Sequence, residues 1–131
     1  MMRDYVRQFC KSIGLSVILA STSAGCTSSP SLPDPLAAGW EGKTVCELLH
    51  DDARQRVLRC TFEPGVGHES HYHDPHFGYT IAGGRMRITD GEGVREVDLV
   101  SGSSFASPGE DSHEALNVGK TTAVFLIVEP K

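Results

Sequence analysis

The feature that most constrains the fold is a series of short runs after Trp40 in which apolar and polar residues often alternate. The runs are rich in β-branched and aromatic residues, and glycine, aspartate, serine and proline separate them. This pattern is typical of β-strands joined by tight turns. We find no helical periodicity after Trp40, and about eight short strands in about 90 residues predict a sandwich or a barrel. The runs are FGYTIA (77–82), GRMRIT (84–89), VREVDL (94–99), EALNV (114–118) and TTAVFLIVE (121–129).

The length and the charge of the chain limit its organisation and its partners. A chain of 131 residues is long enough for one domain with a modest core and too short for two. The net charge is −5, and no run of lysine or arginine occurs. There is thus no electrostatic reason to expect binding to nucleic acid or to an anionic membrane surface. Any function therefore belongs to one folded body, and nucleic acid is not expected as a partner.

The first 25 residues have the layout of an export signal. Arg3, Arg7 and Lys11 precede an apolar run at residues 13–20, and small residues follow this run, as in secretory signal peptides. The apolar run is too short to span a bilayer. We therefore expect the rest of the chain to be exported.

The cysteine that follows this signal resembles the lipidated cysteine of bacterial lipoproteins. Cys26 comes directly after Ser-Ala-Gly, which resembles a lipobox, where the signal is cut before the cysteine and the thiol receives lipid. Ser23 departs from that pattern, in which leucine or a similar residue is usual. The resemblance implies a membrane-anchored lipoprotein that faces the periplasm or the cell exterior. An ordinary cleaved signal peptide and an uncleaved anchor are the alternatives, and both would also export the domain.

Residues 26–40 differ in composition from the rest of the chain. They are rich in serine and proline, which is typical of a flexible tether. We therefore divide the chain into a lipoprotein-type signal peptide at 1–25, a flexible tether at 26–40 and a β-domain at 41–131. Removal of the signal takes away more positive than negative side chains, so the mature body is acidic.

Two cysteines of the body flank a predicted hairpin. Two apolar runs enclose the polar segment DDARQ, whose centre is Ala53, and this pattern predicts two strands joined by a turn. Ala53 is midway between Cys46 and Cys60, so the two cysteines would lie opposite each other, within reach of a disulfide. Two buried free thiols are the alternative, and a register slip of one residue would separate the pair. Export favours the disulfide, because free thiols rarely persist in an oxidising compartment.

Histidines are concentrated in one segment. Four of the six lie within GHESHYHDPHFG. On a strand, residues two apart project from the same face, so His71 and His73 can reach one point while Tyr72 faces the other way. Such a pair by itself can also be solvated or held in a core. A third imidazole, His113, follows a turn shaped by Gly102 and Pro108 and would come from another strand.

The two histidine segments together resemble the two motifs of the cupin superfamily. The first motif, G(X)5HXH(X)3,4E(X)6G, is matched at Gly65, His71, His73, Phe77 and Gly84. The second, G(X)5PXG(X)2H(X)3N, is matched at Gly102, Pro108, Glu110, His113 and Asn117. All spacings agree, but Phe77 replaces the motif's glutamate and Glu110 replaces a glycine. The resemblance covers about residues 43–129 and implies an all-β double-stranded β-helix, or jelly-roll barrel, with a metal in the barrel mouth.

The replacement of the glutamate changes the expected metal centre. A phenyl ring cannot coordinate a cation, so the resemblance implies a divalent metal held by three imidazoles. These ligands are His71, His73 and His113. Imidazole suits Fe, Cu, Ni and Zn, and Mn is a further candidate.

Other residues near the motifs receive weaker assignments. The candidates to replace the lost glutamate as a ligand are His68, Glu69 and His76. We nevertheless expect His68 and His76 to be solvated loop residues, and His50 to be exposed near the hairpin turn. Phe77 and Tyr79 are expected to line the pocket, whereas the alternation in GRMRIT points Arg85 and Arg87 outward.

Three function classes follow from the resemblance. A centre without a carboxylate ligand keeps the full charge of the ion and favours an anionic, bidentate ligand. Thiol dioxygenases and a diketone-cleaving dioxygenase are cupins with three histidines around non-haem iron, and this likeness implies Fe(II) and a dioxygenase. A non-catalytic lipoprotein that binds a metal or a small ligand is the main alternative, and a metal-dependent isomerase or lyase is a further one. Each class takes a small-molecule partner, a homodimer is left open, and no catalytic side chain is identified.

Overall fold

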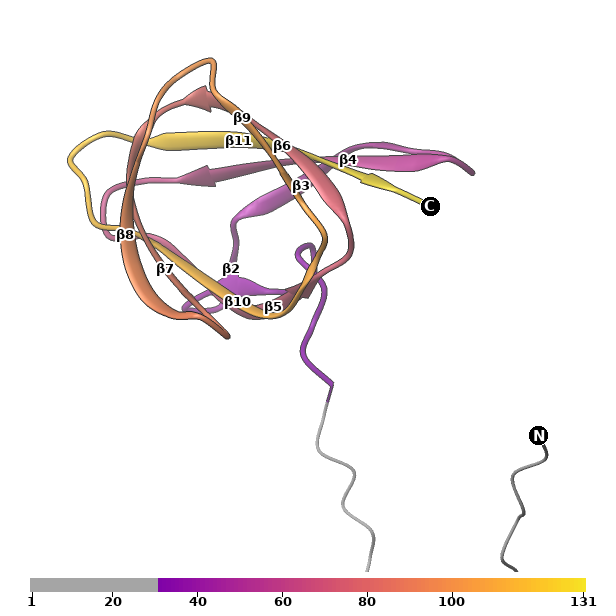
Figure 1. Cartoon of the computed structure of the whole chain (residues 1–131), viewed down its shortest axis with the longest axis horizontal. Coiled ribbons are helices and arrows are strands. Elements are labelled where there is room, and N and C mark those ends of the chain that lie inside the picture. The colour runs from indigo at the N-terminus through magenta and orange to yellow at the C-terminus, as the bar shows by residue number, and fades with distance from the viewer. Residues whose placement is uncertain (1–30) are drawn as a thin grey trace, which may run out of the picture.

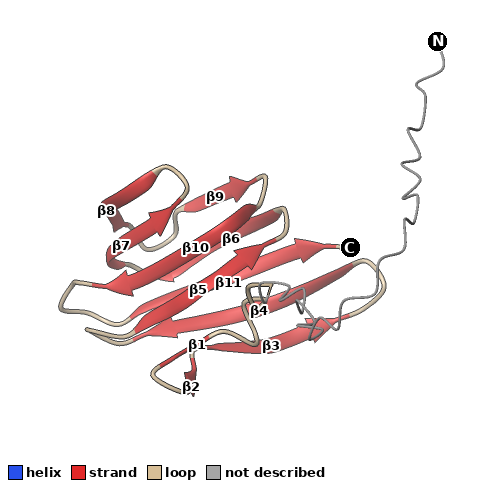
Figure 2. Cartoon of the chain, turned by 90° about the horizontal axis from the view of Figure 1, so that it is seen from below, coloured by secondary structure: helices blue, strands red, loops and turns tan. Residues whose placement is uncertain are grey.

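The computed structural model describes residues 31–131. The signal peptide, Cys26 and the first residues of the expected tether lie outside the described residues. Strands and connecting loops make up the described chain, as Figure 2 shows. That part of the protein contains no helix long and apolar enough to cross a membrane.

The strands form two main sheets that lie opposite each other (Figure 1). The four-stranded sheet has the order β5 (Gly67–His73), β10 (Glu110–Asn117), β7 (Gly84–Asp90) and β8 (Gly93–Leu99). The five-stranded sheet has the order β3 (Cys46–Asp51), β4 (Gln55–Phe62), β11 (Ala123–Pro130), β6 (His76–Ala82) and β9 (Ser104–Ser107). A small hairpin of β1 (Gly39–Trp40) and β2 (Lys43–Thr44) precedes them. The strand pairs within the two main sheets of the described chain are antiparallel.

The core lies between the two sheets. Every second residue of β11 is buried, beginning with Ala123, while the residues between them are partly exposed. This alternation is expected for a strand with one face toward the core. The main apolar residues of the core come from both sheets and are Leu58, Phe62, Met86, Ala115, Phe125 and Ile127. The all-β jelly-roll predicted from the sequence is confirmed.

The hairpin formed by β3 and β4 has the register predicted from the sequence. Strands β3 and β4 pair with Cys46 opposite Cys60, and the structure joins the two sulfurs in a disulfide. Both cysteines are buried in the core. The bond therefore links the edge strand β3 to its neighbour β4 in the five-stranded sheet.

The segment before β1 differs from the tether expected at 26–40. In its described part, Pro35 is fully buried and Ala38 is 3% exposed. Its backbone oxygens accept hydrogen bonds from β5, since the amide of Tyr72 donates to Pro33 (3.1 Å) and the ring of His68 reaches Pro35 (3.0 Å). Proline favours an extended backbone with free carbonyl groups, which suits a tether but also suits a segment packed along a strand. Residues 33–38 therefore belong to the folded body.

We predict that the disulfide contributes substantially to stability. For the fragment 31–131 produced in an oxidising compartment, replacing Cys46 and Cys60 together by alanine should lower the free energy of unfolding by about 3 kcal/mol, because the crosslink closes a loop of roughly 15 residues. Urea unfolding measures this change. Thiol titration of the denatured, unreduced fragment is the check, and two free thiols there would contradict the crosslink.

Candidate metal centre

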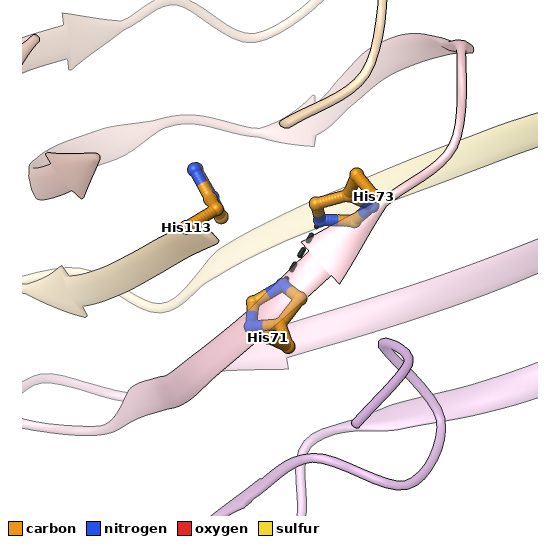
Figure 3. A group of neighbouring side chains, drawn as sticks. All are labelled: His71, His73 and His113. Atoms are coloured by element: carbon orange, nitrogen blue, oxygen red, sulfur yellow. Dashed lines mark hydrogen bonds between the residues drawn. The ribbon is translucent and has the colours of Figure 1, made fainter. Parts of the chain in front are cut away.

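The side chains of three histidines on neighbouring strands lie close together (Figure 3). His71 and His73 lie on β5 and face inward, as their spacing predicts. His113 lies on the neighbouring strand β10, where it is the pairing partner of His71. The pairing of β10 with β5 is irregular on both sides of His113. These bulges allow β10 to bend and to direct a side chain toward a site.

One ring nitrogen of each histidine lies within 4.8 Å of a ring nitrogen of the other two. His71 is fully buried, His73 is buried and His113 is half-buried. Burial lowers the pKa of His113 to about 4, so this ring is neutral at neutral pH. In the described part of the chain this is the one group of histidine, cysteine or acidic side chains with metal-binding geometry.

The hydrogen-bond partner of His71 decides which of its nitrogens carries the proton. His71 Nδ1 lies 2.6 Å from the backbone oxygen of Glu69, which can only accept, so Nδ1 must donate. Burial lowers the pKa of His71 to about 3, so the ring carries one proton at neutral pH. His71 Nε2 therefore presents a lone pair to the barrel interior.

His73 has no neutral form that suits both of its neighbours. Its Nε2 lies 3.0 Å from His71 Nε2, and its Nδ1 lies 3.5 Å from Glu129 Oε1. With the proton on Nδ1, two lone pairs face each other. With the proton on Nε2, the lone pair of Nδ1 faces a carboxylate oxygen.

A cation at the two Nε2 atoms removes this conflict. His73 Nδ1 can then donate to Glu129, and both Nε2 lone pairs have a partner. An added proton would also resolve the conflict within this pair, but it would give no role to the third imidazole, His113. The donor set therefore fits a metal ion bound by three neutral imidazoles, the form of histidine that metals bind.

A buried acidic residue, Glu129, stands behind His73. The backbone of β11 places it at an inward position, and its side chain is almost completely inaccessible. Burial alone raises the pKa of Glu129, but its contacts with His73 and Arg56 outweigh burial and hold the pKa below the ordinary value. Arg56 donates to Glu129 and also reaches Asp34 (3.2 Å) in the docked N-terminal segment. Such an outer carboxylate orients a ligating histidine and fixes its tautomer.

Sequence reasoning did not identify Glu129. In the run AVFLIVEP it lies at every second position together with Ala123, Phe125 and Ile127, and so on the same face of the strand. An acidic residue on the inward face of an apolar strand needs a partner when it is buried. The position of an acidic residue on the apolar face of this strand was the sequence signal that could have identified Glu129.

Two of the proposed substitute ligands are buried, contrary to expectation. His68 and His76 were expected to be solvated, but they are 3% and 7% exposed. His68 Nε2 donates to Pro35 O (3.0 Å), its Nδ1 lies 3.9 Å from the disulfide sulfur of Cys46, and its ring lies against His71 with centroids 3.8 Å apart. His76 is held by the backbone oxygen of Asp74 (2.9 Å) and lies against His73.

None of the three substitutes belongs to the metal-binding group. That group contains only the histidines at positions 71, 73 and 113 among the described residues. The side chain of Glu69 is exposed and accepts a hydrogen bond from the amide of Glu41 (3.0 Å). Its contribution to the centre is its backbone oxygen, which orients His71.

The expected pocket residues Phe77 and Tyr79 face outward instead. Their exposed fractions are 46% and 41%, because the alternation of β6 places His76, Gly78 and Thr80 on the inner face. A Cβ atom on Gly78 would lie 2.1 Å from the ring of Phe105. The ring of Phe105, from β9, therefore occupies the place where a side chain of β6 would project.

The interior next to the histidines contains a cavity of about 110 Å³. Most of its wall is apolar, with Phe62, Phe105 and Phe125 among the lining residues. The polar lining residues are His68, His73, His76, His113 and Glu110. Arg85 and Arg87 take no part, because they pair with Glu96 on the outer face of the four-stranded sheet. The cavity offers room for a small ligand against one side of the histidine cluster.

Comparison with solved structures agrees with the architecture. A cupin domain from Bordetella pertussis Tohama I is similar with a TM-score of 0.63 and 23% identity, covering 79% of this chain and 99% of that one. The polyketide cyclase RemF from Streptomyces resistomycificus is similar with a TM-score of 0.52 and 22% identity, over 65% of this chain and 63% of that one. A cupin superfamily protein from Desulfitobacterium hafniense DCB-2 gives a TM-score of 0.51 at 16% identity, over 65% and 74% of the two chains. These likenesses concern the fold.

A search of curated proteins gives no match. The family model for the cupin domain matches residues 58–129, which is more than half of the chain and includes the three histidines. With this match, the jelly-roll and the histidine cluster, the chain belongs to the cupin family.

Proposed function

We propose that this protein binds a divalent metal through His71, His73 and His113 and, loaded with Fe(II), is a dioxygenase for a small chelating substrate. The observation that carries the metal is the pair of contacts at His73, because no single neutral form of this ring suits both His71 Nε2 at 3.0 Å and Glu129 Oε1 at 3.5 Å. When bound, Fe(II) supplies open coordination positions for substrate and dioxygen.

The residues of the chain fix the geometry of such a centre. The backbone oxygen of Glu69 holds His71 by its Nδ1 atom, and Glu129 stands at the Nδ1 atom of His73. Both rings thus turn Nε2 toward the interior. The phenyl rings of the cavity wall exclude water from one side of the cluster, which strengthens electrostatic interactions within the cavity.

A second candidate is a non-catalytic protein that binds the metal or a small ligand. The cavity of about 110 Å³ is smaller than the roughly 300–1,000 Å³ of ordinary small-molecule sites. That size favours a ligand of few atoms and is compatible with a site that only binds. An isomerase or lyase that uses Zn or Ni remains the third candidate, and it would proceed without dioxygen.

We further propose that the protein is an exported lipoprotein anchored through Cys26. The proposal is supported by the signal-like pattern of residues 1–25 and by the Cys46–Cys60 disulfide, since disulfides are rare in the cytosol. Labelling with a radioactive fatty acid tests it in a bacterial host. Incorporation into the wild type and not into Cys26→Ser would support the anchor, and no incorporation into the wild type would contradict it.

We predict that His113→Ala removes most of the affinity for Co(II), Zn(II) and Fe(II). Loss of an outer hydrogen-bond partner of a ligand costs about 10–100-fold in affinity, and loss of a ligand should cost more. Isothermal titration of the metal measures this change. The matched control is His50→Ala, since His50 is exposed in the first hairpin and contacts Asp52. Equal affinities of the two variants would contradict the three-histidine centre.

We predict that Glu129→Gln weakens metal binding by about 10–100-fold, because an amide no longer offers His73 Nδ1 an anionic acceptor. Titration with Co(II) measures the affinity, and circular dichroism verifies that the variant is folded. The control is Glu47→Gln, which removes an exposed carboxylate paired with Arg59 on the same sheet. A folded Glu129→Gln protein with wild-type affinity would show that the outer carboxylate has no role.

We predict that the protein loaded with Fe(II) consumes dioxygen in the presence of acetylacetone or a small thiol, and that His113→Ala abolishes this uptake. An oxygen electrode and product analysis by mass spectrometry are the measurements. Ligand binding without any product would refute the dioxygenase and support the binding protein. Product formation under anaerobic conditions would support the isomerase or lyase.

A further inference from the structure

Glu110 lines the cavity but does not belong to the group of three histidines. Glu110 begins β10 and is the pairing partner of His73 on β5. One of its oxygens, Oε1, accepts a hydrogen bond from Ser107 Oγ (2.5 Å), and Ser107 Oγ accepts one from the amide of Gly109 (3.1 Å). The side chain is therefore held by its own turn.

The turn that carries Glu110 packs closely against the end of β5. A Cβ atom on Gly109 would lie 2.7 Å from the backbone oxygen of His73, and the φ angle of Gly109 is +102°. Only glycine combines this backbone conformation with so close an approach. The close approach places the backbone of Glu110 directly beside the strand that carries the proposed ligands.

The second carboxylate oxygen, Oε2, is buried and has no hydrogen-bond partner among the described residues. Buried polar atoms are nearly always paired in folded proteins, so an unpaired carboxylate oxygen on a residue that lines the cavity is a candidate ligand contact. The nearby cation, Arg95, is already bonded to Asp90 (2.7 Å). Arg95 also lies with Glu110 at a surface hollow on the outer side of this turn. No described cation is therefore bonded to Oε2.

We propose that Glu110 determines ligand specificity by accepting a hydrogen bond from a positively charged group of the ligand. This inference rests on the proposed metal centre and names the ligand class more closely. The ligand has an anionic head, such as a thiolate, that binds among the histidines, and a short tail that ends in an ammonium group at Oε2. A tail that ends in a carboxylate is repelled by Glu110.

A role of Glu110 as a fourth metal ligand fits the structure less well. Glu110 is not in the group of side chains whose ligand atoms lie within 4.8 Å of one another. Ser107 holds Oε1 on the opposite branch of the carboxylate. The other alternative is that Glu110 orients the ring of His113, because His113 Nδ1 is also buried without a partner. Both alternatives affect the binding of the metal itself, whereas specificity toward the ligand tail does not.

The test uses three thiols with similar length and different tail charge. Co(II)-loaded full-length protein is titrated under anaerobic conditions with 2-aminoethanethiol (positive tail), 1-propanethiol (neutral) and 3-mercaptopropionate (negative). Changes in the visible absorption of Co(II) give the affinities. The variants are Glu110→Gln and, as the matched control, Asp111→Asn, which removes the charge of the neighbouring exposed side chain.

In the wild type and in Asp111→Asn we expect affinity to fall in the order positive, neutral, negative tail. Glu110→Gln should lower the affinity for 2-aminoethanethiol by at least about tenfold and raise that for 3-mercaptopropionate, while the visible spectrum of the thiol-free Co(II) protein stays unchanged. The same order in Glu110→Gln as in the wild type would overturn the proposal. So would an altered spectrum of the thiol-free variant, which would place Glu110 at the metal or behind His113. Failure of the wild type to bind Co(II) would instead refute the metal centre.

Discussion

The contact between His71 Nε2 and His73 Nε2 is the interaction on which the functional interpretation depends. The two nitrogens lie 3.0 Å apart in the barrel interior. The hydrogen bond of His71 to Glu69 turns one lone pair toward this contact, and Glu129 on the other side of His73 favours the tautomer that turns the second lone pair toward it. Water could relieve such a contact at a surface, but His71 is fully buried. Desolvation also disfavours an extra proton, which is why the pKa of His71 is lowered to about 3. A metal ion relieves the contact and gives the neighbouring His113 a role as well.

The fold supports this contact from both sheets and from the N-terminal segment. Strand β5 carries both rings, and β11 of the opposite sheet supplies Glu129 behind one of them. Arg56 connects Glu129 to Asp34, so the segment that leads into the domain is tied to the outer side of the centre. The pairing of β10 with β5 brings in His113, and the turn before β10 brings in Glu110. The centre is therefore assembled by sheet pairing rather than by one local motif.

Sequence reasoning was sufficient where one pattern decides the structure. The alternating runs predicted the all-β domain, and the midpoint of the first hairpin predicted that Cys46 lies opposite Cys60. The spacing of His71 and His73 placed both on one face of a strand. These inferences need only strand periodicity and a turn.

Sequence reasoning failed where the face of a strand depends on a shift of one residue or on a distant partner. Phe77 and Tyr79 were assigned to the pocket from motif spacing, but the parity of β6 turns them outward. The burial of His68 and the docking of residues 33–38 go together, because the ring of His68 donates a hydrogen bond to the backbone oxygen of Pro35. Glu129 is far from the histidines in sequence and reaches His73 only after the two sheets have packed. Contacts between residues so far apart in the chain cannot be inferred from a single sequence.

The direct test of the central claim is a nitrogen-15 spectrum of the histidine rings with and without Zn(II). We expect Zn(II) to shift the Nε2 signals of His71 and His73 together with one ring nitrogen of His113, while the Nδ1 atoms of His71 and His73 stay protonated. Spectra that do not change with Zn(II), or a proton that remains between the two Nε2 atoms in its presence, would contradict a metal centre at this contact.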